Sequence, residues 1–372
     1  MTTTWIIGDL LTGARIQTLP VMAGLWSDLL NGSGTIQCTV DLNDPDVQRL
    51  RLAESARPGR TFLAAVSGDT VLQAGPVWRH SVSEELNTLS IFGAGMYSYF
   101  DRRVLLPVLA PDQLPSDPAT DTNFANHSLQ AIAVAIVQQA LSWPSGNVPV
   151  ITPTPLPGNN ERNYRGADVA PVGERLRQLT GVRDGPDIRF VPRWTTDRLA
   201  VEWVMQVGTP TEPLLFSPQE PVFNVGLEES SVSDVSVSID GANIGSQGFA
   251  SGGRAIEEAL VARAFDPRLT SEGFPLLDLV DSSHATVKEF PTLQGYANEL
   301  VLRSRTPIES WSFTHQTDQR PFLTGFNVGD FAKVRIYNSP YFPDGERRLR
   351  ITSRSGDAVG DTVSLTLQPE VL

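Results

Sequence analysis

The first hundred residues are a succession of short apolar runs separated by turn-forming sequences, and this pattern restricts the N-terminal region to a β-rich fold. The runs at 5–10 and 15–19 are separated by a Thr-Gly pair, and a third run at 35–42 follows the Asn-Gly-Ser-Gly sequence at 31–34. Short runs that end at such residues are typical of strands joined by tight turns. We therefore expect several strands here before any long helix.

The next part of the chain completes a sheet of the size that closes into a small barrel. Asp44 is placed to cap a short helix that begins at Pro45. A hairpin is predicted between strands at 61–66 and 71–74, and a further strand at 86–92 follows it. A set of strands of this size is typical of a small β-barrel.

Proline marks the end of this first region. Four prolines lie in 107–121, which cannot continue a sheet and therefore indicate a boundary or a surface crossover. Residues 128–141 then place apolar side chains at helical spacing on nearly all sides, which predicts a long and mostly buried helix. The segment 144–160 has five prolines and little periodicity, so we expect an extended, exposed loop there.

A second helix and a hairpin are predicted next. Pro171 stands near the first position of the helix, and Gly181 is expected to end it in the left-handed conformation. The strand at 188–194 and its return at 199–207 alternate strictly between apolar and polar residues. One face of this hairpin is therefore expected to pack on the preceding helix.

The C-terminal third mixes strands with two further predicted helices. A strand at 232–239 precedes a glycine- and serine-rich stretch at 241–253, which we expect to be flexible. Helices are predicted at 254–264 and 292–304. The chain then returns to short strands, which are predicted at 332–337, 348–353 and 362–368.

Composition excludes several classes of function. The chain has 42 Asp and Glu against 29 Lys and Arg, and this acidic balance disfavours a sequence-independent grip on nucleic acid. The single cysteine, Cys38, can form neither an intrachain disulfide nor a cysteine-based zinc cluster, and we expect it to be a small buried side chain. Residues 1–16 contain no basic segment ahead of an apolar run, so neither a signal peptide nor a membrane span is expected.

The histidines do not form a recognisable catalytic or metal-binding motif. His80, His127, His284 and His315 are widely spaced, so no helical zinc-binding pair is available. His284 follows Ser283, which invites a nucleophile interpretation. The Gly-x-Ser-x-Gly turn is missing, however, and catalytic triads do not form by adjacency in sequence.

The other candidate sites have simpler structural explanations. The acidic cluster at 41–46 lacks the glycine and the distal glutamate of a calcium loop, so helix capping explains it better. The acid pairs Glu228-Glu229 and Glu257-Glu258 are expected to be solvated. The glycines at 241–248 and 93–95 lack phosphate-binding signatures. Trp194 and Trp203 fall on the apolar phase of the predicted hairpin, which favours core positions over a sugar-stacking platform. We predict no catalytic, cofactor-binding or metal-binding residues.

A series of short strings occurs in a fixed order along the chain. They are Thr12-Gly13, Leu19-Pro20, Trp26, Leu30-Asn31-Gly32, Gly34, Val40-Asp41-Leu42, the stretch from Gly95 to Arg103, the helix and hairpin from Val172 to Val207, and the strands after Gly329-Asp330. Their order resembles the minor tail proteins of siphoviruses that infect actinobacteria, a family similar to the baseplate-hub proteins of other tailed phages. The likeness covers most of the chain by pattern, and each string is short and mostly structural.

The resemblance implies an α+β, β-rich fold in which two small β-barrel domains carry inserted α/β domains. A homotrimer would then present six barrels, which match a sixfold tail tube. Laid on this sequence, the first barrel is 1–118, the α/β insertion is 119–207, the second barrel is 208–245 plus 315–372, and a helix-containing insertion is 246–314.

The function implied by the resemblance is structural. The chain would be a virion protein of the tail tip, made in the host cytoplasm, that joins the tail tube and distal tail ring to the receptor-binding tip and gates DNA ejection. Its partners would be the distal tail protein, the tape measure protein and the tail-tip or receptor-binding proteins. DNA would pass through the lumen without specific binding, and no enzyme activity, cofactor or membrane insertion is expected.

Two other functions stay open at this point. A tail-associated peptidoglycan hydrolase needs a nucleophile or metal set, and a carbohydrate-binding receptor module needs aromatic side chains exposed on a shallow face. If the chain surrounds the DNA path, the wall that faces the axis should be neutral or acidic, because clustered arginines would hold the phosphate backbone. The pairs Arg102-Arg103 and Arg347-Arg348 should then lie at subunit contacts or pair with nearby acids.

Overall fold

The computed structural model describes residues 3–182, 184–255, 258–284, 287 and 290–369, with only the backbone described at 254–255, 258–259 and 283–284. The chain divides into two compact units. Unit 1 comprises Met1–Val235 and Phe313–Leu367, and unit 2 comprises Ser236–Ser312 and Gln368–Leu372.

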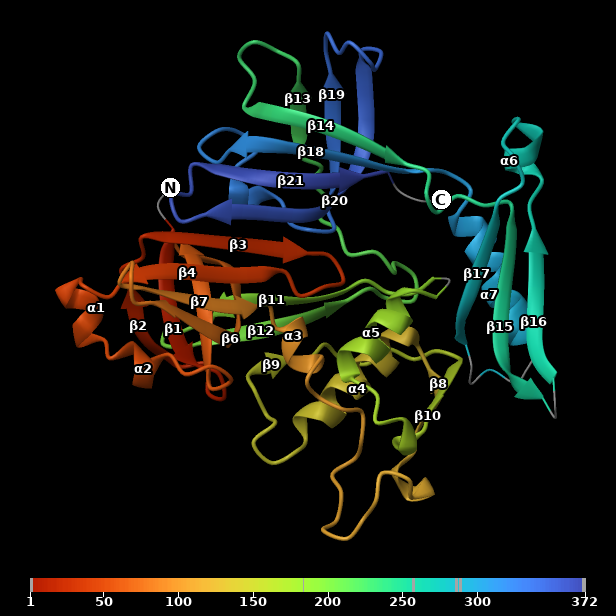
Figure 1. The fold of residues 1–372 in the computed structure, drawn as a ribbon, viewed down its shortest axis with the longest axis horizontal. Coiled ribbons are helices and arrows are strands. Elements are labelled where there is room, and N and C mark those ends of the chain that lie inside the picture. Colours follow the sequence, from red (N-terminus) through yellow and green to blue (C-terminus); the bar gives the residue numbers. More distant parts are fainter. Residues whose placement is uncertain (1–2, 183, 256–257, 285–286, 288–289, 370–372) are drawn as a thin grey trace. The chain divides into compact units, whose positions relative to one another are not determined.

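One large sheet holds thirteen of the described strands (Figure 1). Along its length the strands are β14 (Val232–Asp240), β18 (Ile308–Gln316), β21 (Thr362–Gln368), β20 (Gly345–Asp357), β3 (Ala23–Leu29), β4 (Thr35–Asp41), β7 (Thr88–Ala94), β6 (Thr70–Ser83), β5 (Thr61–Ser67), β1 (Thr4–Asp9) and β2 (Arg15–Leu19), while β19 (Phe331–Ile336) pairs with β20 and β13 (Val222–Val225) pairs with β19. Strands from both ends of the sequence therefore share one hydrogen-bonded sheet.

Two long strands each change their pairing partner along their length. The first half of β6 pairs with β5 and its second half with β7. The change of partner falls between Pro76 and Val77, next to Gly75, where a Cβ atom would lie 1.9 Å from the Ala94 carbonyl oxygen. Only glycine fits such a close backbone approach. In the same way, β20 pairs with β19 through Gly345–Arg350 and with β3 through Ser353–Asp357, which connects the C-terminal strands to the N-terminal ones.

The β-rich α+β class is confirmed, whereas closure into two barrels is not observed. The path of the large sheet ends at β14 on one side and at β2 on the other, and none of the sheets in the described part of the chain closes on itself. The N-terminal and C-terminal strands do not form two separate barrels. They belong to one continuous sheet, because β3 pairs with the second half of β20.

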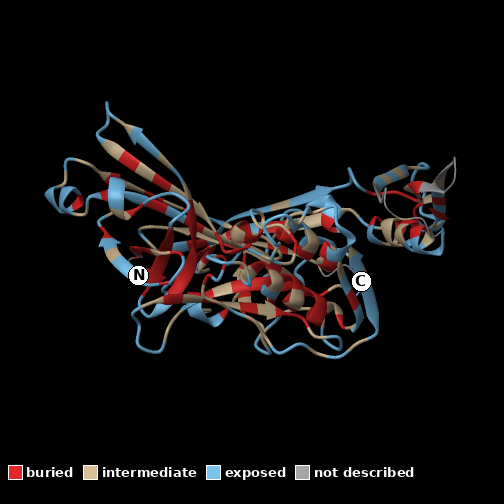
Figure 2. Ribbon diagram, turned by 90° about the horizontal axis from the view of Figure 1, so that it is seen from below, coloured by how far each residue is buried: buried red, intermediate tan, exposed pale blue. Residues whose placement is uncertain are grey.

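One hydrophobic core of unit 1 lies where helices and a second small sheet pack on this strand set. Figure 2 colours the buried residues of the chain red. The small sheet consists of the hairpin β11 (Ile188–Trp194) and β12 (Val201–Val207), with β9 (Val150–Ile151) parallel to β12. Helices α3 (Tyr97–Phe100), α4 (Leu129–Leu141) and α5 (Val172–Thr180) contribute to the same core, as do β1, β5 and β6. The remaining elements of this region are α1 (Pro45–Arg49), α2 (Leu52–Ser55), β8 (Thr122–His127), which pairs with β10 (Asn160–Tyr164), and 3-10 turns at Pro118–Thr120 and Gly166–Asp168.

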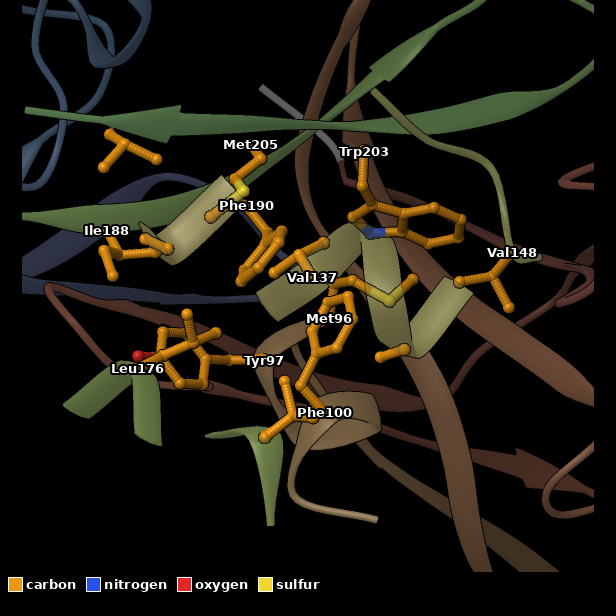
Figure 3. Close-up of a cluster of buried hydrophobic side chains, with 14 of the residues drawn as sticks. Met96, Tyr97, Phe100, Val137, Val148, Leu176, Ile188, Phe190, Trp203 and Met205 are labelled. Atoms are coloured by element: carbon orange, nitrogen blue, oxygen red, sulfur yellow. The ribbon is translucent and has the colours of Figure 1, made fainter. Parts of the chain in front are cut away.

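Aromatic side chains connect the hairpin to the helices and to the first strands (Figure 3). Trp203 is fully buried and donates its indole N–H to the Ala74 carbonyl at 2.9 Å. Its ring meets Phe62 edge-on at 5.4 Å between centroids, and Phe190 stacks on Phe100 at 4.9 Å. The predicted packing of the hairpin on the preceding helix is confirmed by Leu176, which lies in the same core.

Several local predictions agree with the structure. Asp44 caps α1 by accepting from the Asp46 amide at 2.8 Å. The long helix predicted at 128–141 is α4, which the structure shows to be capped by Ser128, whose hydroxyl accepts from the Ala131 amide at 3.0 Å. Helix α5 is present and ends at Gly181 as predicted, but the left-handed conformation predicted for Gly181 is wrong. Gly181 has φ of −84°, so the helix ends in a right-handed residue whose amide bonds the Arg177 carbonyl.

Unit 2 is a three-stranded sheet with one helix packed on it. Its strands are β15 (Gln247–Ala255), β16 (Glu258–Phe265) and β17 (Asp278–His284), its long helix is α7 (Phe290–Arg303), and α6 (Arg268–Ser271) is a short turn of helix. The core between sheet and helix consists of small and branched side chains: Ala250, Ala262, Ala264, Leu293, Ala297 and Val301. The helix predicted at 292–304 is therefore confirmed.

Two predictions in this unit are wrong. The stretch 241–253 is not simply flexible, because it enters β15, and the helix predicted at 254–264 is replaced by β16. In β16 the buried Ala262 and Ala264 alternate with the exposed Val261, Arg263 and Phe265, which is the two-residue period of a strand. The glycines serve close packing, since a Cβ atom on Gly248 would lie 2.8 Å from the Val301 side chain.

No helix among the described residues is long and apolar enough to cross a membrane.

Candidate functional site

The most strongly constrained polar site in unit 1 is a buried ion pair between β20 and the start of the β11 hairpin. Arg350 of β20 bonds the carboxylate of Asp187, and their side chains are only 11% and 5% exposed. The same carboxylate accepts from the Leu215 amide at 2.8 Å and from the Asn31 side-chain amide at 2.9 Å. Asn31 in turn accepts from the Ile188 amide at 2.7 Å. Four segments that are distant in sequence therefore meet at one carboxylate.

Two further buried arginines lie beside this pair. Arg189 of β11 donates to the Val328 carbonyl and to the Gln206 side chain, the latter at 2.9 Å. Arg354 of β20 donates to the Phe326 carbonyl at 3.0 Å and lies 3.5 Å from the carboxylate of Asp28. Burial lowers the pKa of Arg189; among the neighbouring charges, Asp28 opposes this shift and Arg354 adds to it.

Together these side chains hold the loop at 326–330. Arg354 bonds the carbonyl of Phe326, Arg189 that of Val328, and Arg350 that of Gly329 at 2.9 Å. We call Arg189, Arg350 and Arg354 the arginine clamp. Asp330 closes the loop from inside by accepting from the Asn327 amide at 2.6 Å, and it also accepts from the Ser217 amide at 2.7 Å.

The clamp is suited to holding parts in place, not to proton-transfer chemistry. Arginine keeps its proton in proteins, so it does not act as a general acid or base. Its planar fork of donors instead matches several fixed acceptors at once, here backbone carbonyls and a carboxylate. The arrangement joins β20, the hairpin, the loop at 326–330 and the segment at 213–217.

The arginine-dense segments are satisfied locally. Arg348 pairs with Glu220 at 2.7 Å and lies over the Phe331 ring, as the sequence analysis allowed. Arg347 lies over the Phe342 ring at 4.8 Å, and Arg102 over the Trp78 ring at 4.2 Å. Arg103 donates to the Ala140 carbonyl at 3.0 Å. Aromatic rings and a carbonyl thus serve as partners for this group alongside an acid.

The histidines considered as catalytic candidates lie on different strands, β6, β8, β17 and β18. His80 is half-buried, and burial lowers its pKa. His127 bonds the Ala125 carbonyl through Nδ1 at 2.6 Å. The side chain of His284 lies outside the described residues, as do Glu257 and the side chain of Glu258. Glu228 and Glu229 are exposed, as expected. Within the ranges that the structure describes, no cluster of three or more His, Cys, Asp or Glu could hold a metal ion.

His315 is a core residue of β18. It is fully buried, its Nε2 lies 2.8 Å from the Pro321 carbonyl, and its ring meets Phe223 at 5.2 Å between centroids. Because that carbonyl can only accept, Nε2 carries the proton. Burial lowers the pKa of the ring, since a second proton would place a charge among aromatic side chains.

The core interpretation of the two hairpin tryptophans agrees with the structure. Trp203 is fully buried and Trp194 packs against the same core. The glycines at 93–95 allow close packing of the backbone, since a Cβ atom on Gly95 would lie 2.0 Å from the Ser33 carbonyl. A third tryptophan, Trp143, lies beside an open cavity. Its role was not predicted, because it stands between the helix and the proline-rich segment, where the sequence has no periodicity.

No protein-family model matches the sequence, and no curated protein matches it. Solved structures do share its fold. The 43 kDa tail protein of prophage MuSo2 from Shewanella oneidensis is 15% identical with a TM-score of 0.61, and the match covers 100% of this chain and 99% of that one. The tail protein from Neisseria meningitidis MC58 is 13% identical with a TM-score of 0.55, and the match covers 99% and 96%.

A third structure extends this likeness. Prophage tail protein gp18 from Listeria monocytogenes EGD-e is 12% identical with a TM-score of 0.51, and the match covers 98% of this chain and 94% of that one. At these identities the likeness is one of fold. The chain therefore has a phage tail protein fold along essentially its whole length, which agrees with the broader part of the resemblance noted from the sequence.

We predict that Arg350→Met destabilises the protein by about 3–5 kcal/mol, because it leaves the Asp187 carboxylate buried without its cation. The matched control is Arg348→Met on the same strand, whose half-exposed ion pair with Glu220 contributes about 0–1 kcal/mol. Urea unfolding followed by tryptophan fluorescence measures both. Equal losses in the two variants would contradict a special role for the clamp.

A second prediction concerns pH. The lowered folded-state pKa of His315 means that the unfolded chain binds more protons once the pH falls below about 6.5, the ordinary histidine pKa. The free energy of unfolding should therefore be highest above that pH and decrease as the pH falls toward the lowered pKa. His315→Phe should flatten this dependence, and His80→Gln should remove only the separate share of His80. An unchanged slope in His315→Phe, measured by urea unfolding between pH 5 and pH 8, would refute the assignment.

Proposed function

We propose that this chain is a structural protein of a phage tail, the baseplate hub of a siphovirus-type tail tip. The observation that carries the proposal is the whole-chain likeness to the prophage MuSo2 tail protein. Such coverage leaves no large part of the chain without a counterpart in a tail protein. The proposed place of the protein is the virion, at the tail tip or baseplate.

In this role the hub joins the tail tube and distal tail ring to the receptor-binding tip and gates DNA ejection. Its partners are the distal tail protein, the tape measure protein and the tail-tip or receptor-binding proteins. The arginine clamp supports a mechanical role, because a joint that transmits load needs its segments held at fixed positions. Arg350 joins β20 to Asp187 at the start of the β11 hairpin, and Arg354 joins β20 to Asp28 of β3, a strand from the other end of the sequence.

The charge of the chain supports a DNA path without specific binding. The net charge is −13, which repels the phosphate backbone. Arg102, Arg348 and Arg350 are each held by a ring, an acid or a carbonyl within the chain. Side chains held in this way are not available to bind the phosphate groups of DNA that passes through the lumen.

In this proposal the chain consists of two β-rich parts that form the ring and two parts that are inserted between them. The two barrel-like, β-rich parts are 1–118 and 208–245 plus 315–372, and the inserted parts are 119–207 and 246–314. In a homotrimer, the two β-rich parts of each chain make six similar positions around the axis, which match a sixfold tube above and a threefold tip below.

We predict three copies of this chain in the assembled tail tip. Fusing a small label to the chain and reconstructing the intact particle by electron cryo-microscopy measures the copy number directly. Six copies or one copy would contradict the trimer. A label found away from the tail tip would contradict the hub function itself.

The rival function of a peptidoglycan hydrolase leads to a separate prediction. Purified protein should produce no clearing in a zymogram on host cell wall, because the described residues bring no three His, Cys, Asp or Glu side chains together that could hold a catalytic metal ion, and the sequence has no nucleophile motif. Clearing that disappears on a single substitution, with His284→Ala tried first, would reveal a catalytic site. A lysozyme lane run on the same gel shows that the wall substrate is cleavable.

A further inference from the structure

An open cavity is lined by the C-terminal end of α4, by the loop that follows it and by β9. Figure 1 labels both elements. Its volume is about 530 Å³, which lies within the range of small-molecule sites. The lining comes from the last turn of α4, the loop that follows it and the start of the proline-rich segment. The lining residues are Gln138, Leu141, Ser142, Trp143, Pro144, Ser145, Asn147, Val150 and Thr152.

The loop that carries Trp143 is held by hydrogen bonds from other parts of unit 1. The indole N–H of Trp143 donates to the Leu106 carbonyl at 3.0 Å, which fixes one edge of the ring. The Tyr99 hydroxyl donates to the Gly146 carbonyl at 3.0 Å. Between these anchors, Ser145 adopts φ of +59°, a conformation that non-glycine residues rarely take. A loop anchored on both sides of a strained residue is a preorganised surface.

The chemistry of the lining restricts what can bind. It contains no ionisable side chain, so a charged ligand would lose hydration without gaining a counter-charge. The polar groups are the amides of Gln138 and Asn147 and the hydroxyls of Ser142, Ser145 and Thr152. A purely apolar ligand would bury these groups without partners.

A ligand with hydroxyl groups around its edge and apolar C–H faces meets both conditions. The half-buried Trp143 ring supplies a flat apolar surface, while amides and hydroxyls can both donate and accept. Gln138 donates to Thr152 at 3.0 Å, so its carbonyl oxygen is held in one orientation for a ligand hydroxyl. Asn147 is exposed and offers a donor and an acceptor at the rim.

We propose that this cavity binds a neutral saccharide, with a sugar ring against Trp143 and its hydroxyls bonded to Asn147 and Gln138. This is a binding activity in addition to the hub role and does not depend on it. A tail protein with such a site could contact a surface glycan of the host cell directly.

The experiment is isothermal titration calorimetry of the purified full chain with four neutral tetrasaccharides: chitotetraose, cellotetraose, maltotetraose and mannotetraose. We expect at least one to bind with a Kd below 5 mM, typical of a shallow site at roughly −3 to −5 kcal/mol. Asn147→Ala should weaken that binding at least tenfold, and Trp143→Ala should abolish it. The matched control Asn159→Ala changes an exposed asparagine of the proline-rich segment outside the cavity and should bind as the unaltered chain does.

Three outcomes overturn the proposal: none of the four sugars binds, binding persists in both cavity variants, or Asn159→Ala weakens binding as strongly as Asn147→Ala. Trp143→Ala removes a hydrogen bond and some packing, so its thermal unfolding is compared with that of the unaltered chain. If this variant does not fold, the exposed Gln138→Ala and Asn147→Ala variants decide the question, because neither side chain is part of the core.

Discussion

The arrangement of unit 1 depends on the guanidinium groups of the arginine clamp and the acceptors around them. Arg189, Arg350 and Arg354 each bond a different carbonyl of the loop at 326–330, and Arg350 also neutralises the buried Asp187. Removing such charges from water costs several kcal/mol, so a well-packed apolar cluster of equal volume could stabilise the fold as well or better. Contacts between apolar side chains, however, are not directional, whereas hydrogen bonds are. A guanidinium fork bonds only acceptors in its plane, so the clamp fixes which segments meet and at what angle.

That directionality matters because of how the large sheet is built. Its continuity rests on β20, which pairs with β19 along its first half and with β3 along its second. Arg350 and Arg354 lie on either side of this change of partner. Their side chains therefore hold the adjoining loop and hairpin at the point where the strand leaves one partner and joins another. A joint of this kind carries load through backbone hydrogen bonds, and the buried charges prevent the register of the junction from shifting.

Sequence reasoning succeeded where the signal is periodic and local. The hairpin at 188–207 and the helix α4 follow from spacing alone, and Asp44 follows from capping chemistry. It failed at β16, because the alanine-rich segment at 254–264 has a high helix propensity, and packing against α7 overrides that propensity in the folded chain. The clamp was out of reach for a different reason: Asn31, Asp187 and Arg350 are separated by long stretches of chain, and nothing local marks an arginine as buried. Trp143 was missed because its segment has no period. The closed barrels were inferred from strand number, which does not report which edges pair.

The acidic balance of the chain bears on the proposed DNA path, whereas the Trp143 cavity depends on its own lining, because a charge acts only over a short distance. At physiological salt, a charge is screened within about 8 Å. A DNA strand passing through a lumen lies close to the surface of the chain, where a net charge of −13 opposes contact with the phosphate backbone and favours free passage. The lining of the Trp143 cavity contains no ionisable side chain, so an anionic polysaccharide gains no counter-charge there, whereas a neutral sugar needs none. The local lining, and not the overall charge, therefore selects a neutral ligand at this site.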